Sequence, residues 1–258
     1  MNSYIKIIGL IVLLFVENSL KSQCIQGEIP FTAGEVLNYD VVYNWGVVWI
    51  NAATVRFKIT ETTYENRKAF GFISEGKTLP EYNWFYKVDD RFESVADFET
   101  LQSYYYRRRV QEGSYTADEK LWFNPSEKKL SVDVERSTTP RKQYTLPWNN
   151  CGFDLITAVY FVRTLNFSNY KINDRIPIKV VIDGEWFDLY VRFAGKELLT
   201  MRDGRQFNCF KLKPLLVEGT IFKGGEDMTV WVADDKAKTP VLIEAKILVG
   251  SVKAILIK

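Results

Sequence analysis

Apolar and polar residues alternate with a period of two along most of the chain, a pattern typical of half-buried β-strands. The segment EVLNYDVVYNW (Glu35–Trp45), for example, sets Tyr39 and Val41 on one face and Asn38 and Asp40 on the other. The pattern predicts about thirteen strands, of which the other twelve are Ile50–Glu61, Lys68–Gly76, Tyr82–Phe92, Leu101–Val110, Asp118–Phe123, Lys129–Glu135, Arg175–Ile182, Glu185–Phe193, Phe207–Val217, Asp227–Ala233, Val241–Lys246 and Ser251–Lys258.

Turn-forming residues separate these strands. NPSEKK (Asn124–Lys129) predicts a hairpin, because proline fixes φ and asparagine caps a turn. Asp183-Gly184 is a two-residue type I′ signal, and RDGRQ (Arg202–Gln206) repeats it. Asp89-Asp90 indicates a further polar break.

One segment departs from the strand pattern. DLITAVYFVRTLN (Asp154–Asn166) is apolar around most of a helical circumference, and Asp154 suits a first helical turn. The sequence therefore predicts a mostly β fold: a curved antiparallel sheet, half-barrel or barrel-like, of about thirteen strands with one buried helix near 154–166. Residues 23–258 form a single exported domain on this interpretation, or two β halves joined by residues 151–166.

The first 22 residues indicate export. A short segment carrying Lys6 precedes the apolar run IIGLIVLLFV, which is too short to span a bilayer and is followed by polar residues, as in a secretory signal peptide. We expect residues 1–22 to be removed and the protein to work in the periplasm or cell envelope. A soluble product is favoured over lipid attachment at Cys24, because Lys21 and Gln23 fit a lipoprotein site badly.

Charge and composition exclude several classes of function. Without residues 1–22 the chain has 32 basic and 31 acidic residues, which gives no electrostatic footprint for nucleic acid. The chain contains no histidine, so Ser-His-Asp triads, Cys-His nucleophiles and histidine-based zinc or haem sites have no ligand or base. We therefore expect no enzymatic activity. We also expect no cofactor and no integral membrane segment.

The three cysteines are Cys24, Cys151 and Cys209. None lies in a CxxC motif, so a zinc knuckle or thioredoxin-type site is not supported. In an oxidising compartment we expect one disulfide, and Cys24–Cys151 is favoured because both flank the regular elements. Cys209 lies in a predicted strand core, where it would be a small buried apolar residue.

Three segments carry a family resemblance. Leu212–Leu256 combines PLLVEGTIF, a WV-x-DD turn and a GSVKA ending. Together with AGEVLNYDVVYNWGVVWINAATV (Ala33–Val55) and the helix in CGFDLITAVYFVRTLNF, it resembles the domain-of-unknown-function family numbered 3108. The resemblance implies an exported protein of a Gram-negative bacterium, such as those of Bacteroidetes. It implies no activity and no catalytic residue.

Two kinds of charged cluster are candidate sites. Asp89-Asp90 with Glu93, and Glu226-Asp227 with Asp234-Asp235, would suit paired-carboxylate glycoside hydrolysis, but turn formation is the favoured interpretation. Neither has the spacing of a calcium loop. In the strand around Arg107-Arg108-Arg109, Arg107 and Arg109 share a face and could bind an anionic head group or glycan. Pairing with acidic neighbours is the favoured alternative.

Aromatic residues suggest the function. Trp45, Trp49 and Trp84 lie in the first third of the chain and could line a pocket for an apolar or amphipathic ligand, although ordinary core packing is a strong alternative. Non-enzymatic binding of a lipid or similar envelope ligand is the favoured function. A glycan-binding or carbohydrate-active protein, and a structural envelope component that binds another protein by strand addition, remain as alternatives.

Overall fold

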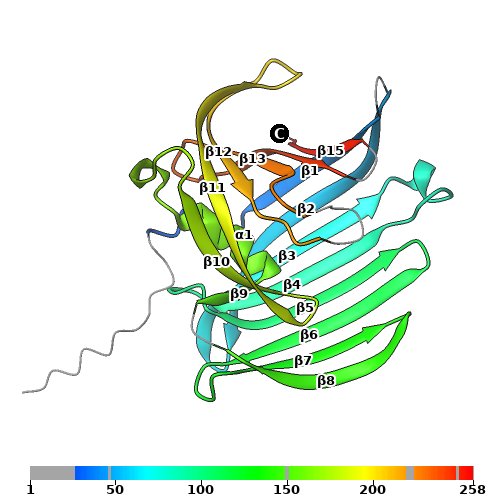
Figure 1. Cartoon of the computed structure of the whole chain (residues 1–258), viewed down its shortest axis with the longest axis vertical. Coiled ribbons are helices and arrows are strands. Elements are labelled where there is room, and N and C mark those ends of the chain that lie inside the picture. Colours follow the sequence, from blue (N-terminus) through cyan, green and yellow to red (C-terminus); the bar gives the residue numbers. More distant parts are fainter. Residues whose placement is uncertain (1–26, 46–47, 149–150, 219–223, 248–249, 258) are drawn as a thin grey trace, which may run out of the picture.

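A computed structural model describes residues 27–45, 48–148, 151–218, 224–247 and 250–257. It is a curled sheet of fifteen strands with one helix inside the curl (Figure 1). The strands are β1 (Val36–Trp45), β2 (Val48–Tyr64), β3 (Arg67–Thr78), β4 (Asp89–Asp97), β5 (Ser103–Glu112), β6 (Tyr115–Asn124), β7 (Lys129–Arg136), β8 (Thr139–Pro147), β9 (Gly152–Asp154), β10 (Arg175–Ile182), β11 (Glu185–Thr200), β12 (Gln206–Pro214), β13 (Met228–Ala233), β14 (Pro240–Lys246) and β15 (Ser251–Leu256).

Two antiparallel meanders form this sheet. The first runs from β1 to β8 and the second from β10 to β15, and β1 pairs with β15 to join them. Only the short β9 pairs in parallel, with β10. The sheet does not close, because its two edge strands, β8 and β9, are not paired with each other. The topology brings both ends of the described chain to the middle of the sheet.

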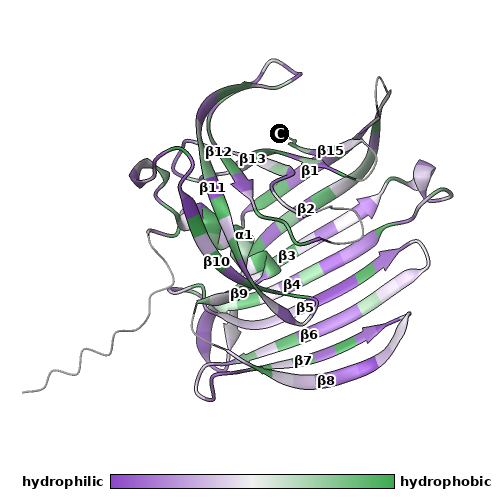
Figure 2. Cartoon of the chain, in the orientation of Figure 1, coloured by the Kyte–Doolittle hydropathy of each residue, from purple (hydrophilic) through white to green (hydrophobic). Residues whose placement is uncertain are grey.

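The helix α1 (Leu155–Thr164) fills the curl. Its Ile156 and Tyr160 pack into a core formed by β2–β7, while Phe161 and Leu165, the residue after its last turn, pack into a second core formed by β10–β13. Hydrophobic residues gather on α1 and on the strands around it, whereas hydrophilic positions interrupt β3–β8 (Figure 2). The interior of the curl is therefore occupied by the protein's own helix.

A buried carboxylate begins this helix. Asp154 is the N-cap, and its Oδ1 accepts from the backbone N of Thr157 at 2.9 Å. Its Oδ2 accepts from the hydroxyls of Ser94 and Ser103 at 2.8 and 2.6 Å. Burial raises the pKa of Asp154 despite these hydrogen bonds. Because β4 and β5 supply the serines, the cap also fixes α1 against the first meander.

Side chains bridge the open edge of the curl. Trp148 Nε1 donates to the carbonyl of Gly152 at 3.2 Å, and Trp186 Nε1 donates to the carbonyl of Pro147 at 2.9 Å. A Cβ atom on Gly152 would lie 2.5 Å from the Trp186 ring, so only glycine fits there. The tip of the β10–β11 hairpin adds an ion pair between Asp183 and Arg108 at 2.5 Å.

Several sequence predictions are confirmed. The curled, mostly antiparallel sheet and the buried helix are present, and α1 ends two residues earlier than predicted. Asp183 and Gly184 have φ values of 53° and 75°, as a type I′ turn requires. Asn124 Oδ1 caps the β6–β7 turn by accepting from the backbone N of Glu127 at 3.1 Å.

Other predictions were wrong. The sequence predicted about thirteen strands, but β8 and β9 were missed. β8 is a polar edge strand with little alternation, and β9 has only three residues. The segment Tyr82–Phe92 is not one strand: a 3-10 helix, η1 (Pro80–Tyr82), and a loop precede β4. Asp89-Asp90 belongs to β4 and is not a break between strands.

Candidate functional site

The sheet has an inner face, which contacts α1, and an outer face opposite to it. Residues paired across neighbouring strands share a face. Tyr39 of β1 packs in the interior, so its neighbour Asp40 lies on the outer face. Asp40 pairs with Ile255 of β15, and Ile255 pairs in turn with Leu242 of β14. The outer surface of this half of the sheet is thus partly apolar.

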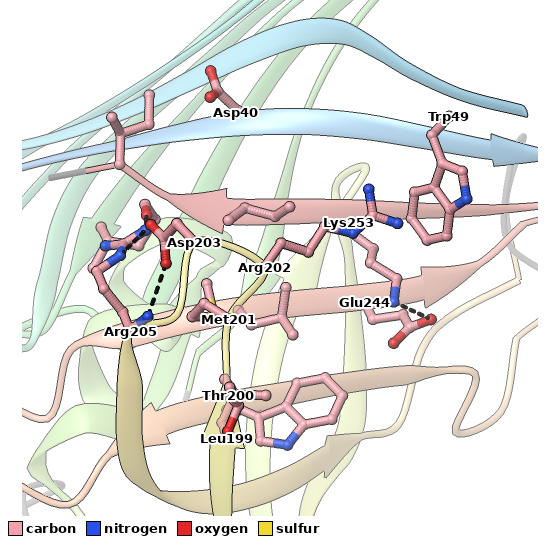
Figure 3. A pocket seen from close by; sticks show the side chains of 15 residues that line it. Asp40, Trp49, Leu199, Thr200, Met201, Arg202, Asp203, Arg205, Glu244 and Lys253 are labelled. Carbon is pink, nitrogen blue, oxygen red and sulfur yellow. Dashed lines mark hydrogen bonds and ion pairs between the residues drawn. The ribbon is translucent and has the colours of Figure 1, made fainter.

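A pocket of about 590 Å³ lies on that surface, which we call the outer-face pocket (Figure 3). Its apolar lining comes from β13, β14 and β15 and from the end of β11. The residues that line it are Asp40, Trp49, Leu199, Thr200, Met201, Arg202, Asp203, Arg205, Trp231, Leu242, Glu244, Lys253, Ile255, Leu256 and Ile257. Its volume falls within the range of small-molecule sites.

The β11–β12 hairpin forms one wall of the pocket. Gly204 has a φ of +84°, which permits the tight turn between the two strands. Arg205 Nε pairs with Asp203 at 2.6 Å, and its Nη2 donates to the carbonyl of Leu256 at 2.8 Å. Arg205 therefore fixes the hairpin tip against β15.

Two cations stand beside an aromatic ring at the mouth of the pocket. The guanidinium carbon of Arg202 lies 3.9 Å from the centroid of the Trp49 ring, and Lys253 Nζ lies 5.3 Å from the same centroid. Lys253 also pairs with Glu244 at 3.3 Å. Within the described part of the chain, exposed Arg202 makes no ion pair. Its charge is thus available to a ligand.

A buried donor lines the same pocket. Trp231 is 7% exposed, and its indole Nε1 has no hydrogen-bond partner among the described residues. A buried N–H group without a partner costs about 1–3 kcal/mol. An acceptor atom on a bound molecule would remove that cost.

Of the predicted tryptophans whose side chains the structure describes, Trp49 lines this pocket and Trp84 does not. Trp49, which is 39% exposed, lines it. Trp84 does not line it and is 83% exposed in the loop between β3 and β4. Trp45 ends β1, and its side chain lies outside the described residues. The pocket that Trp49 lines is on the outer face of the sheet, because α1 fills the inside of the curl.

Arg107 and Arg109 share the outer face, as predicted, but on the other half of the sheet. Arg107 Nε and Nη2 bind both carboxylate oxygens of Asp118 at 2.9 and 2.6 Å. Arg109 pairs with Glu93 at 3.5 Å. Hydrogen bonding by Arg107 lowers the pKa of Asp118. These arginines are therefore neutralised by neighbouring strands.

The acidic clusters are structural too. Asp235 Oδ1 accepts from the backbone N of Lys238 at 2.7 Å in the turn after β13, and Asp234 pairs with Lys196 at 2.7 Å. Glu226 pairs with Arg192 at 2.6 Å. Among the described residues, no group of three or more His, Cys, Asp or Glu side chains is arranged to hold a metal ion.

Asp90 behaves differently, because burial and the nearby Glu112 raise its pKa to about 6. Its Oδ1 accepts from the backbone N of Gln111 at 3.1 Å. Asp90 does not line the outer-face pocket. A raised pKa alone does not indicate a catalytic site.

Cys151 is disulfide-bonded and Cys209 is a free, buried thiol. Burial raises the pKa of Cys209 to about 11, so it stays protonated at neutral pH. Cys24 lies outside the described residues, and its pairing with Cys151 stays a prediction. No helix of the described residues is long and apolar enough to cross a membrane.

Comparison with known proteins supports the fold. The family described as "Protein of unknown function (DUF3108)" matches residues 38–257. No curated protein shows significant similarity to the chain. A solved structure, the β-barrel-like protein of the DUF1849 family from Brucella abortus, is similar with a TM-score of 0.52 and 8% identity, over 86% of this chain and 95% of that one. At this identity the likeness shows the fold alone.

Proposed function

The chain belongs to the DUF3108 family of proteins of unknown function, and we propose that it is an exported, non-enzymatic protein that binds an amphipathic ligand with an anionic head group. The outer-face pocket is the binding site. The observation that carries the proposal is Arg202, a cation stacked on Trp49 at 3.9 Å with no carboxylate partner among the described residues.

The rest of the pocket suits such a ligand. Leu242, Ile255 and Met201 offer apolar surface to an acyl or alkyl chain, and burying that surface contributes about 25 cal/mol per Å². The anionic group would lie between Arg202 and Lys253, which both stand by Trp49. Charge-assisted hydrogen bonds from a guanidinium are stronger than neutral ones, so the head group would orient the ligand.

The pocket carboxylates do not oppose this arrangement. Asp203 is paired with Arg205, and Glu244 is paired with Lys253. Asp40 lies four residues along β1 from Asn44, the residue that pairs with Trp49, and is separated from the Trp49 ring (Figure 3). The end of the pocket at Trp49 therefore carries the positive charge.

A titration with two matched lysophospholipids tests the proposal. Lysophosphatidylglycerol is anionic and lysophosphatidylcholine is zwitterionic, and both can carry the same acyl chain below their micelle concentrations. We expect saturable shifts of tryptophan emission, with at least about tenfold tighter binding of the anionic lipid, equal to ~1.4 kcal/mol. This preference should shrink at high salt.

Two tryptophan variants locate the signal. Trp49→Phe should reduce the emission shift and leave the part that comes from Trp231, which also lines the pocket, whereas Trp84→Phe, at a tryptophan outside the pocket, should keep the whole shift. Equal affinity for the two lipids would contradict the proposed head group. A shift with soluble oligosaccharides but with neither lipid would instead support the glycan-binding alternative, which would use the same Trp49 ring.

Export is part of the proposal and rests on the apolar segment Ile7–Val16. Intact-mass measurement of the protein from its own cells should give a mature N-terminus within Ser22–Cys24. An uncleaved chain would contradict export, and a diacylglyceryl adduct on Cys24 would make the protein a lipoprotein.

A further inference from the structure

The loop between β3 and β4 displays aromatic side chains that the outer-face pocket does not use. Trp84 and Phe85 are 83% and 79% exposed, and their ring centroids lie 5.9 Å apart. Figure 1 shows this loop projecting from one end of the sheet, next to η1. We call Trp84 and Phe85 the aromatic tip.

The loop behind the tip is held in place. The backbone N of Phe85 and of Tyr86 donate to the carbonyl of Tyr82 at 3.0 and 3.2 Å. Thr78 Oγ1 donates to the carbonyl of Tyr86 at 3.2 Å and accepts from the backbone N of Val88 at 2.9 Å. The tip is therefore presented to solvent by an ordered support.

Neighbouring contacts add to this support. A Cβ atom on Gly113, in the β5–β6 turn, would lie 3.1 Å from the Tyr86 ring, so the ring rests on that glycine. The backbone N of Gly113 donates to the carbonyl of Lys87 at 2.8 Å. The two turns brace each other, and the aromatic tip remains outside the contact.

The size and shape of the tip favour a membrane over a protein partner. Two aromatic side chains bury at most roughly 500 Å², whereas a stable protein interface needs about 800 Å² from each partner. The tip is also convex, unlike a small-molecule pocket. Aromatic rings with a polar edge are the residues that settle at the head-group level of a bilayer.

Charge around the tip selects the kind of lipid. Lys77 pairs with Asp89 at 3.4 Å. Lys87 is a second cation of this part of the chain, and the carboxylates of Glu81 in η1 and Glu112 at the end of β5 balance its charge. This surface has no excess of positive charge with which to attract anionic lipids. Aromatic insertion would therefore supply the affinity.

We propose that the aromatic tip docks the protein on the head-group region of a zwitterionic lipid bilayer. Trp84 and Phe85 would insert between head groups while the folded sheet stays outside. This inference goes beyond the ligand pocket, because none of the residues of the tip lines that pocket.

Flotation with phosphatidylcholine vesicles tests the docking. We compare the wild type, the double variant Trp84→Ala/Phe85→Ala, and the matched control Ile172→Ala/Leu198→Ala, which removes two other exposed apolar side chains. The tip variant should lower the partition coefficient at least about tenfold, and the control should change it less than about twofold. Because the tip makes no core contact, both variants should keep the wild-type melting temperature.

Four results would overturn the inference. The first three are a wild type that does not float with phosphatidylcholine vesicles, an equal loss in the tip and control variants, and a homodimer in sedimentation that Trp84→Ala/Phe85→Ala dissociates. Arg202→Glu should float like the wild type. If Arg202→Glu instead abolishes flotation, the pocket and not the tip binds the vesicle.

Discussion

The outer face of the sheet carries two halves with opposite arrangements of charge. On β3–β8 nearby carboxylates pair with the arginines: Arg91 pairs with Glu75 of β3 and with Glu93 of its own strand, and Arg107 pairs with Asp118 of β6. On β11–β15 and β1, the same face is partly apolar and leaves Arg202 without an ion pair among the described residues. Pairing, rather than the number of cations, distinguishes the first half from the surface that we propose binds a ligand.

The difference follows from strand order. Successive strands of the first meander place Arg opposite Asp or Glu. Arg109 is paired with Asp118 of the next strand, and Arg107 is paired with Glu93 of the preceding strand. Long-range pairing of β1 with β15 instead brings Trp49 of the β1–β2 hairpin close to Lys253. The β11–β12 turn then adds Arg202 from a third region of the chain.

The largest expected effect is at Arg202. Arg202→Glu places a like charge beside an anionic head group, so the affinity for lysophosphatidylglycerol should fall about thirtyfold or more, equal to ~2 kcal/mol. Calorimetry measures the affinity, and urea unfolding should show a stability within about 0.5 kcal/mol of the wild type, because the side chain is exposed.

The matched control is Arg67→Glu, since Arg67 also stacks on an aromatic ring, 4.6 Å from the Tyr104 centroid. This variant should bind the lipid like the wild type. If both charge reversals weaken binding equally, the effect comes from net charge and the distinction between the two halves fails.

A smaller effect is expected at Asp118. Asp118→Asn leaves Arg107 without its bidentate partner and should lower the free energy of unfolding by about 1 kcal/mol at pH 7. The folded-state pKa of Asp118 is lowered, so its stabilisation is present above the unfolded pKa near 3.8 and is lost as pH falls through the folded value. The gap between variant and wild type in urea unfolding should therefore close below pH 4.

For comparison, Asp188→Asn removes a carboxylate that is mostly exposed and whose ion-pair partner among the described residues is Lys179, at 3.1 Å. This substitution should change stability little. Lipid affinity should stay within about twofold in both variants. A loss of lipid binding in Asp118→Asn would mean that the ion-paired half also contributes to the ligand site.

The last effect concerns Asp90 of the first meander, because burial disfavours the ionised form of its carboxyl group. Its folded pKa of about 6 exceeds the unfolded value near 3.8, so its ionised form destabilises the fold above pH 6. Asp90→Asn should raise the free energy of unfolding by about 1 kcal/mol at pH 7.5, after allowing for partial solvation, and by little at pH 4.

Urea unfolding at both pH values measures this difference, with Asp89→Asn as the neighbouring control, because Asp89 is paired with Lys77. A stabilisation that is the same at pH 4 and pH 7.5 would show that the amide acts through something other than charge.

Local patterns in the sequence predicted much of the fold. Period-two alternation identified most strands, the Asp-Gly pair identified the β10–β11 turn, and the apolar run after Asp154 identified α1. Residues 82–88 were misread because aromatic residues are common in strands, and composition does not tell a buried ring from an exposed one. β8 was missed because an edge strand with Arg141 and Lys142 shows no apolar face.

The site was less predictable than the fold. Trp49 was selected as an aromatic residue that could line a pocket, but Arg202 and Lys253 beside it lie some 150–200 residues away in the sequence and come near it through the long-range pairing of strands. The sequence predicted the RDGRQ turn, but no neighbouring residue in the sequence indicates that Arg202 has no carboxylate partner among the described residues. The RRR cluster was selected because three cations are adjacent in the sequence, but carboxylates of the neighbouring strands neutralise Arg107 and Arg109.

Native mass spectrometry of protein extracted from its own envelope tests the central claim most directly. The wild type should retain an amphiphile whose mass and fragmentation show an acyl or alkyl chain and an anionic head group, and Arg202→Glu should lose it. A wild type without any adduct, or the same adduct retained at the same occupancy by Arg202→Glu, would contradict binding at the outer-face pocket.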